Sequence, residues 1–229
     1  MSPPAPVRVP VFIVIGGGAD GVYYVRQLRR AIESGRLVTE RIVVVDRDPV
    51  CPAAGQAGGI VAFEEATWGD WLDRHLAALD PAAHLVPYHW APHLLVDWLA
   101  AEATRAGARV RRGGSLPSLG LPMERDTAGG DRALSYATWL CPPTCIEPAF
   151  CPHTRGPRDW SLAARAAGDR AIVFRCLHLI YGVGTIPVAG ALAARHRLLS
   201  EAAKGRRQYL VATSSHCHAL ATALEVAPA

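Results

Sequence analysis

The sequence is poor in several kinds of residue, and these shortages exclude whole classes of protein. Charged residues make up 19% of the 229 residues, against 50% hydrophobic residues, so the chain is too apolar for an intrinsically disordered protein. Lys204 is the single lysine among 24 basic residues, and the arginines are scattered in pairs. Because nucleic-acid surfaces need a clustered basic face, we expect no nucleic-acid partner despite the net charge of +4.

Several common catalytic signatures are also missing. The chain has no Gly-x-Ser-x-Gly elbow, no Walker A phosphate loop and no His-Glu-x-x-His helix. The sequence therefore does not carry the usual marks of an α/β-hydrolase, a P-loop nucleotidase or a zinc peptidase.

Long hydrophobic runs are scarce. Residues 177–194 form an 18-residue stretch without Asp, Glu, Lys or Arg, which is near the shortest length of a membrane span. Three glycines and Pro187 interrupt it, so we interpret it as a buried strand, a glycine loop and the start of a helix. The run at residues 11–15 is too short for a signal peptide. We therefore expect a cytoplasmic protein with no membrane contact.

The order of apolar patterns predicts the fold. VFIVI at residues 11–15 and the run at 42–45 are typical of strands buried on both faces, and apolar residues recur at helical spacing between them. Similar alternation continues along the chain, and Ser214 or Ser215 is a candidate cap for a last short helix. The sequence thus predicts an α/β, Rossmann-like fold: a mainly parallel sheet with helices on both faces.

The domain organisation follows from the positions of proline and glycine. The first ten residues contain four prolines and are predicted to be a flexible arm. Residues 11–229 are predicted to be a single domain, with a loop excursion at 113–131 and a Cys-rich loop at 141–157.

A glycine loop, residues 16–21, separates the first strand from the first helix. Gly16, Gly18 and Gly21 have the spacing Gly-x-Gly-x-x-Gly, and Asp46 ends the second strand 25 residues after Gly21. On these residues, the segment 11–48 resembles the Rossmann-type dinucleotide-binding unit. The resemblance implies that the loop binds the pyrophosphate of NAD(P) and that Asp46 binds a ribose hydroxyl. S-adenosylmethionine would use the same crevice, and a plain strand-to-helix turn is the alternative.

Three of the six cysteines lie within eleven residues, at Cys141, Cys145 and Cys151. In a cytoplasmic protein such crowding points to metal or redox chemistry more than to stable disulfides. Thiolates are soft ligands that suit iron–sulfur clusters and zinc. We favour an iron–sulfur cluster over zinc, and a disulfide between Cys141 and Cys145 is a third alternative.

A fourth ligand must come from elsewhere in the chain. His153 follows closely, Cys176 ends a predicted strand, and His216 and His218 follow the last predicted strand. In a parallel sheet the carboxyl ends of strands lie at one edge, so we expect these side chains to meet there. Each also has a simpler interpretation, since a lone buried Cys or His is more often a packing residue.

Glu147, between the cysteines, is a candidate catalytic proton donor, with a solvated loop carboxylate as the alternative. Together these features predict an oxidoreductase with a cluster and a nucleotide cofactor, acting on a small-molecule substrate or a redox partner protein. A non-enzymatic zinc-binding adaptor and an adenosyl-dependent transferase remain as alternatives. A homo-oligomer is compatible with the sequence.

Overall fold

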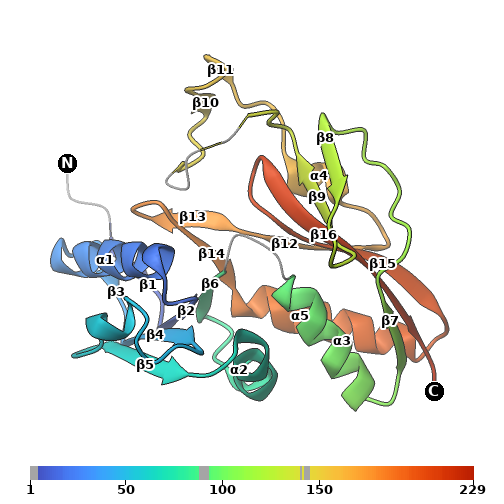
Figure 1. The fold of residues 1–229 in the computed structure, drawn as a ribbon, viewed down its shortest axis with the longest axis horizontal. Coiled ribbons are helices and arrows are strands. Elements are labelled where there is room, and N and C mark those ends of the chain that lie inside the picture. The colour runs from blue at the N-terminus through green and yellow to red at the C-terminus, as the bar shows by residue number, and fades with distance from the viewer. Residues whose placement is uncertain (1–4, 88–92, 140, 142–144) are drawn as a thin grey trace. The chain divides into compact units, whose positions relative to one another are not determined.

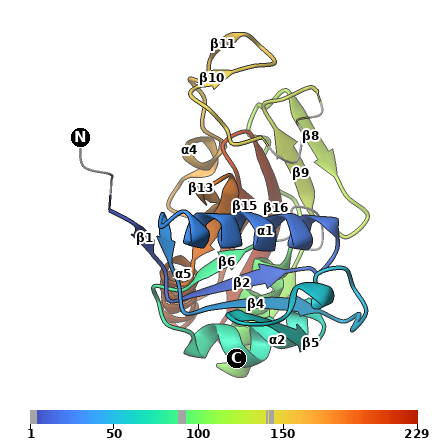
Figure 2. The same cartoon turned by 90° about the vertical axis from the view of Figure 1, so that its left-hand side faces the viewer.

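The computed structural model describes residues 5–87, 93–139, 141 and 145–229. The chain divides into two compact units, shown as ribbons in Figures 1 and 2. Unit 1 comprises Met1–Tyr88 and Leu177–Gly190, and unit 2 comprises His89–Cys176 and Ala191–Ala229. Residues 1–4 of the predicted arm and residues 142–144 of the Cys-rich loop lie outside the described part of the chain.

Unit 1 is built on a six-stranded sheet. Across the sheet, the strands are β13 (Leu177–Ile180), β14 (Val183–Pro187), β6 (His84–Val86), β2 (Val11–Ile15), β4 (Arg41–Asp46) and β5 (Val61–Glu65). The four strands from β6 to β5 are parallel, while the β13–β14 hairpin joins β6 in antiparallel pairing. The strand β2 lies between two parallel neighbours and is buried on both faces, because its five residues are all large and apolar.

The remaining elements of unit 1 cover or flank this sheet. They are β1 (Val7–Arg8), α1 (Ala19–Glu33), β3 (Leu37–Val38), η1 (Ala54–Gln56), α2 (Trp68–His75) and η2 (Leu76–Ala78). The buried side of α1 carries Tyr24, Val25 and Leu28, which pack with the apolar residues of β2 and β4. Helix α1 ends at Glu33 with Ser34 as its C-cap, and the following Gly35 has a φ of 68°, which suits glycine and turns the chain toward β3.

Unit 2 is built on a second six-stranded sheet, which is mostly antiparallel. In order it contains β12 (Ala171–Arg175), β15 (Arg207–Ser214), β16 (His218–Ala227), β9 (Arg132–Ser135) and β8 (Met123–Asp126), and β7 (Arg109–Arg112) also pairs with β16. The pairing of β12 with β15 is parallel, and the other pairings are antiparallel.

Helices pack on both faces of the sheet of unit 2. These helices are α3 (Leu94–Arg105), α4 (Leu162–Ala166) and the part of α5 (Val188–Ala202) that belongs to this unit. On one face Leu162 packs with Ala212 and Ala221. On the other face His93, just before α3, makes hydrogen bonds of 2.9 Å with Thr213 and Thr222. The short hairpin of β10 (Phe150–Cys151) and β11 (Gly156–Pro157) belongs to the Cys-rich loop.

The prediction of a Rossmann-like, mainly parallel sheet is wrong. The structure is a mixed α/β arrangement with two separate six-stranded sheets, and antiparallel pairing dominates the second. The main error concerns residues after Ser214, where the sequence suggested a helix. That segment is the ten-residue strand β16, which pairs with β15, β9 and β7. Neighbouring strands override the low strand preference of its alanines.

Among the described residues, no helix combines the length and the apolar character needed to cross a bilayer. Residues 177–194 form the β13–β14 hairpin and the start of α5, as the interruption by glycine and proline suggested.

A candidate four-cysteine site

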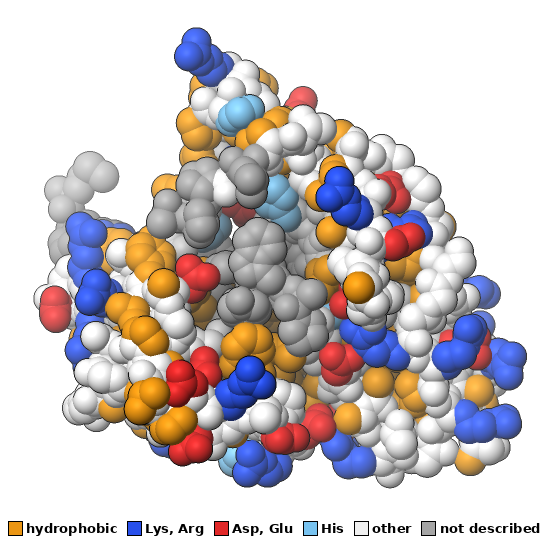
Figure 3. Space-filling view, viewed as in Figure 1, with side chains coloured by type: hydrophobic (Ala, Val, Ile, Leu, Met, Phe, Trp, Pro, Cys, Tyr) orange, Lys and Arg blue, Asp and Glu red, His pale blue; other side chains and the backbone are white. Residues whose placement is uncertain are grey.

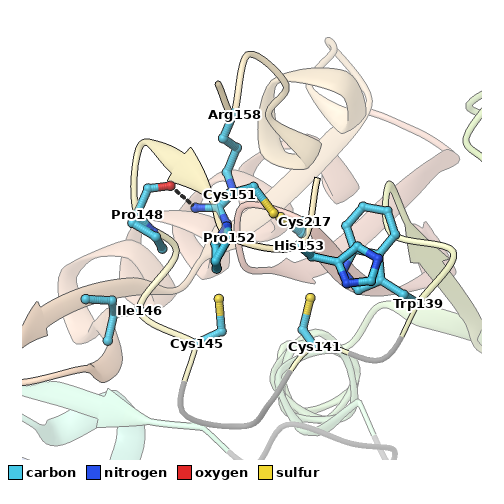
Figure 4. Close-up of a pocket in the computed structure, with 10 residues that line it drawn as sticks. All are labelled: Trp139, Cys141, Cys145, Ile146, Pro148, Cys151, Pro152, His153, Arg158 and Cys217. Atoms are coloured by element: carbon cyan, nitrogen blue, oxygen red, sulfur yellow. Dashed lines mark hydrogen bonds between the residues drawn. The ribbon is translucent and has the colours of Figure 1, made fainter. Parts of the chain in front are cut away.

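Four cysteine thiols line one cavity in unit 2, which measures about 260 Å³. Cys141, Cys145 and Cys151 belong to the Cys-rich loop, whereas Cys217 belongs to the turn between β15 and β16. In Figure 4 the sulfur atoms of Cys141 and Cys145 point toward the side of the cavity where Cys151 and Cys217 lie. The fold therefore brings soft ligands from two distant segments to one place.

Cys151 is held in a tight hairpin. The N–H of Arg155 donates to the carbonyl of Cys151 at 2.9 Å, and Arg155 has a φ of 54°, so the chain turns sharply around the sulfur. The backbone N–H of Thr154 leads a set of hydrogen bonds to this sulfur, which lower the pKa of Cys151 to about 7. A large fraction of this thiol is therefore thiolate at neutral pH, and thiolate is the form that binds metals.

Cys217 is held by a tight turn and by an indole. The N–H of Ser215 donates to the carbonyl of His218 at 2.8 Å, and Ser215 Oγ accepts from the N–H of Cys217 and of His218. Nε1 of Trp160 donates to Cys217 Sγ at 3.3 Å. Burial raises the pKa of Cys217, and the bond from Trp160 opposes that rise. The sulfur therefore has a defined position, with N–H donors from Trp160 and Arg158 directed at it.

One guanidinium group, that of Arg158, lies among these thiols. It donates to the carbonyl of Pro148, which fixes it against the loop (Figure 4). Its charge acts on Cys217 and Cys145, and it also bonds to Cys151. A positive charge in this position reduces the repulsion between neighbouring thiolates, because it favours the charged form of each.

Three buried nitrogens at or beside the cavity complete no hydrogen bond of ordinary geometry within the described residues. They are Nε1 of Trp139, Nε of Arg158 and Nε2 of His216, which is next to Cys217 in the sequence. Trp139 and Arg158 both lie close to cysteine sulfurs and line the cavity. Unpaired buried donors are costly, so this arrangement suits a ligand that offers electron-rich acceptors.

The spacing of the thiols distinguishes between kinds of metal site. In the part of the chain that the structure describes, no three His, Cys, Asp or Glu side chains are placed to hold a single metal ion. Tetrahedral zinc needs sulfur atoms about 2.3 Å from one centre. An iron–sulfur cluster accepts wider spacing, because its thiolates can bind different iron atoms. The two kinds of site therefore differ in the sulfur spacing that they need.

The other predicted ligands lie in different places. His153 lines the cavity and stacks on Trp139, with ring centroids 4.2 Å apart. Cys176, His216 and His218 are not among the residues that line the cavity. The expected meeting at one edge is nevertheless present in part, since the N–H of Cys176 donates to the carbonyl of Ser214, at the end of the parallel neighbour β15.

Outside the cavity, Cys176 is in a state that does not favour metal binding, and His218 is held by a hydrogen bond to another side chain. Burial, with the nearby charge of Glu147, raises the pKa of Cys176 to about 12, so its thiol stays protonated. Burial lowers the pKa of His218, whose Nδ1 forms a hydrogen bond of 2.9 Å with Ser135 Oγ. These contacts fit packing and support of the sheet.

Glu147 lies beside the cavity. Its Oε1 accepts a hydrogen bond from the backbone N–H of His216 at 2.8 Å, so the carboxylate joins the Cys-rich loop to the turn that carries Cys217. The predicted disulfide alternative is not formed, since Cys141 and Cys145 are both free thiols.

The sequence interpretation named three of the four cavity cysteines as candidate ligands and placed Cys217 at the same edge without selecting it. It selected the imidazoles on either side of Cys217, at His216 and His218. A signal was available, because a cysteine directly after the last predicted strand completes a four-thiolate set with the Cys-rich loop. Arg158 and Trp160 were also missed, since their role depends on distances that spacing along the chain does not reveal.

The glycine loop lies in unit 1, and the packing of the protein itself accounts for most of its glycines. Gly16 has a φ of 96°. A Cβ on Gly17 would lie 2.2 Å from Cys51 Sγ, and a Cβ on Gly21 would lie 2.1 Å from the carbonyl oxygen of Gly16. Gly18, the N-cap of α1, differs because a Cβ there would meet nothing within 4 Å.

Asp46 is engaged within this loop. Its Oδ2 accepts from the N–H of Gly17 at 2.6 Å, and its Oδ1 accepts from the N–H of Asp48 at 3.0 Å. One loop N–H is therefore directed at a carboxylate, and the predicted ribose ligand already has two partners. The polar groups of this loop fit a self-satisfied turn better than a complete nucleotide site.

Comparison with known proteins identifies the family. A family model described as "Uncharacterized protein, C-terminal domain" (AF_1314_C) matches residues 94–227, from the start of α3 to the end of β16. No curated protein and no solved structure matches the chain. The match covers more than half of the chain and includes the four cavity cysteines. The chain therefore belongs to the AF_1314_C family.

Proposed function

We propose that the protein is an iron–sulfur redox protein whose cluster is bound by Cys141, Cys145, Cys151 and Cys217. The observation that carries this proposal is that these four thiols, from two distant segments, line one cavity of about 260 Å³. Four thiolates are the usual ligands of both two-iron and four-iron clusters. When bound, the cluster would supply a site that accepts and releases single electrons.

The surroundings of the thiols support a cluster. The sulfurs of Cys151 and Cys217 already accept N–H bonds, the N–H of Trp139 is directed at Cys141, and within the described residues Nε of Arg158 completes no hydrogen bond of ordinary geometry. Inorganic sulfide and thiolate sulfurs both accept hydrogen bonds, and such bonds tune the reduction potential of a cluster. The positive charge of Arg158 would balance part of the net negative charge of a cluster with four thiolates.

The position of the loop supports electron exchange with an external partner. Cys141 and Cys145 are only partly buried, and the neighbouring Ile146 is 57% exposed. A cluster at these thiols would lie near the surface, where a redox partner protein or a small-molecule substrate can approach. Six free thiols also suit a reducing compartment such as the cytoplasm.

Anaerobic purification with metal analysis tests this proposal. We expect about two to four iron atoms per chain, with a similar amount of acid-labile sulfide, and a visible absorption that bleaches on reduction with dithionite. If the protein contains zinc and no sulfide, the result supports the alternative proposed from the sequence, a zinc ion that stabilises the loop. A chain that binds neither metal, before or after reconstitution, would contradict both.

The glycine loop gives a second candidate, the binding of a nucleotide such as NAD(P) or S-adenosylmethionine in unit 1. We propose it on the open space above Gly18, because the protein's own packing does not require glycine there. The bond between Gly17 and Asp46 must then open for a ribose to bind. Titration calorimetry with the three compounds tests it, and the absence of heat with all three would remove it. The loop is independent of the cluster proposal.

A further inference from the structure

The proposed cluster requires that two segments of unit 2 keep a fixed position relative to each other. One is the Cys-rich loop with three of the ligands, and the other is the turn from Ser215 to His218 with the fourth. The hydrogen bond from the His216 N–H to Glu147 Oε1, at 2.8 Å, joins the two. It is a charge-assisted bond to a carboxylate, which is stronger than a bond between neutral groups.

The rest of the turn is bound to other parts of the unit. The N–H of Leu162, in α4, donates to the carbonyl of His216 at 3.0 Å, and the N–H of Tyr136 donates to the carbonyl of Cys217 at 3.0 Å. These bonds anchor the turn to α4 and to the end of β9. The bond from Glu147 differs in that it reaches the segment between Cys145 and Cys151.

The backbone of Glu147 indicates that this bond has a structural purpose. Its φ is 52°, in the left-handed region that costs energy for residues other than glycine. A loop selected for easy turning alone would favour glycine there. A residue with a long acceptor side chain in this conformation suggests that the side chain contributes more than the backbone loses.

We propose that Glu147 is a positioning residue: its carboxylate clamps the Cys-rich loop onto the β15–β16 turn and so sets Cys217 at the correct distance from the other three thiols. This inference rests on the proposed cluster site. The sequence suggested that Glu147 is a proton donor. We propose instead that it holds two groups of ligands in position.

Three substitutions at Glu147 separate the contribution of its carboxylate from that of its backbone conformation. Glu147→Gln keeps an acceptor oxygen and the backbone preference, Glu147→Gly relaxes the backbone and removes the acceptor, and Glu147→Ala removes the acceptor without relaxing the backbone. The measurement is iron and sulfide bound per chain after anaerobic reconstitution with limiting iron. We expect Gln to behave like the wild type, while Gly and Ala weaken cluster binding by about tenfold to a hundredfold, as losses of supporting contacts do.

A second measurement does not depend on the cluster. In metal-free protein, the His216 amide should exchange its hydrogen about tenfold faster in the Gly and Ala variants than in the wild type, because each lacks the hydrogen bond. The Gln variant should exchange as the wild type does. Far-UV circular dichroism on each variant identifies any that fails to fold. The Gly variant is the control for backbone strain, because glycine adopts the left-handed conformation without cost.

The outcomes are distinct. If the wild type binds a cluster and all of the variants bind it equally, the positioning role is overturned. If Gly matches the wild type and Ala does not, backbone strain explains the effect and the clamp is also overturned. If the wild type binds no iron but the exchange rates follow the expected order, the clamp stands and the cluster proposal fails.

Discussion

The glycine loop of unit 1 and the Cys-rich loop of unit 2 differ in how their polar groups are satisfied. In the glycine loop, Asp46 and the N–H of Gly17 bond to each other, and close packing within the protein requires glycine at Gly17 and Gly21. Around the four-thiol cavity, the thiols are free, and Trp139 and Arg158 direct N–H groups at the sulfurs of Cys141 and Cys151.

This difference shows that a motif and a site are separate things. A glycine pattern with the right spacing can serve the packing of a strand against a helix, as at Gly21. Thiols that gather around a cavity, with N–H donors and a balancing cation, have no comparable use in packing. The following predictions would break or sharpen this comparison.

The largest effect is expected for the cavity thiols. Cys217→Ser should abolish the bound cluster, because hydroxyl is a poor ligand for iron and the fourth position is then lost. Cys176→Ser is the matched control, since Cys176 lies outside the cavity in the same unit, and it should keep full iron content. Iron and sulfide per chain measure both. Equal loss in the two variants would show that the cavity does not define the site.

The next largest effect is a dependence of stability on pH that is due to His93, a buried side chain of unit 2 whose two ring nitrogens both form hydrogen bonds. Burial, with the charge of Arg112, lowers its pKa from 6.5 to about 3. The unfolded chain therefore binds a proton at a pH where the folded chain does not. The free energy of unfolding should fall as the pH falls from 6.5 toward 3, by up to about 1.4 kcal/mol per pH unit.

Urea denaturation across this pH window checks the prediction for His93. The carboxylates also titrate there, so the informative quantity is the difference between the wild type and His93→Gln, whose slope should be smaller. If the two slopes are the same, the histidine is not held neutral by its burial and by the charge of Arg112.

A smaller effect is expected in the glycine loop. Gly21→Ala places a methyl group 2.1 Å from the backbone carbonyl of Gly16, so α1 must shift, at a cost of about 1–3 kcal/mol. Gly18→Ala meets open space and should cost no more than about 1 kcal/mol, the usual loss at an N-cap. Denaturation curves followed by circular dichroism compare them. A greater loss at Gly18 would contradict the packing account.

The smallest effect is expected at Trp160. Trp160→Phe keeps an aromatic ring but removes the N–H that bonds to Cys217 Sγ at 3.3 Å. One hydrogen bond contributes about 1 kcal/mol, so the affinity for the cluster, measured by competition with an iron chelator after reconstitution, should fall roughly fivefold. Trp68→Phe, in unit 1, is the control and should leave the affinity unchanged.

Much of unit 1 could be predicted from the sequence, and less of unit 2. A run such as VFIVI specifies a strand buried on both faces, and the apolar period from Val22 to Ile32 specifies α1. The segment His218–Ala227 is rich in alanine and lacks strict alternation, so its own preference favours a helix. Its pairing with β15, β9 and β7 decides its conformation, and those partners are distant in the sequence.

Only part of the candidate site could be predicted from the sequence. The crowding of Cys141, Cys145 and Cys151 is a property of the sequence, and the structure places all three at one cavity. The identity of the fourth cavity thiol depends on which side chain of the β15–β16 turn faces the cavity. Cys217 does so while His216 and His218 do not line it, a difference that only the backbone of the turn determines.

The distance along the chain between Cys151 and Cys217 also has a consequence for biosynthesis. A ribosome makes the Cys-rich loop well before it makes the turn with Cys217, and β12, α5 and β15 are made in between. The four-thiol cavity cannot close until nearly all of unit 2 has emerged and the β15–β16 hairpin has formed. A cluster of the proposed kind would therefore have to be delivered after translation of this region, and a chain that stalls before Cys217 would lack the fourth thiol of the cavity.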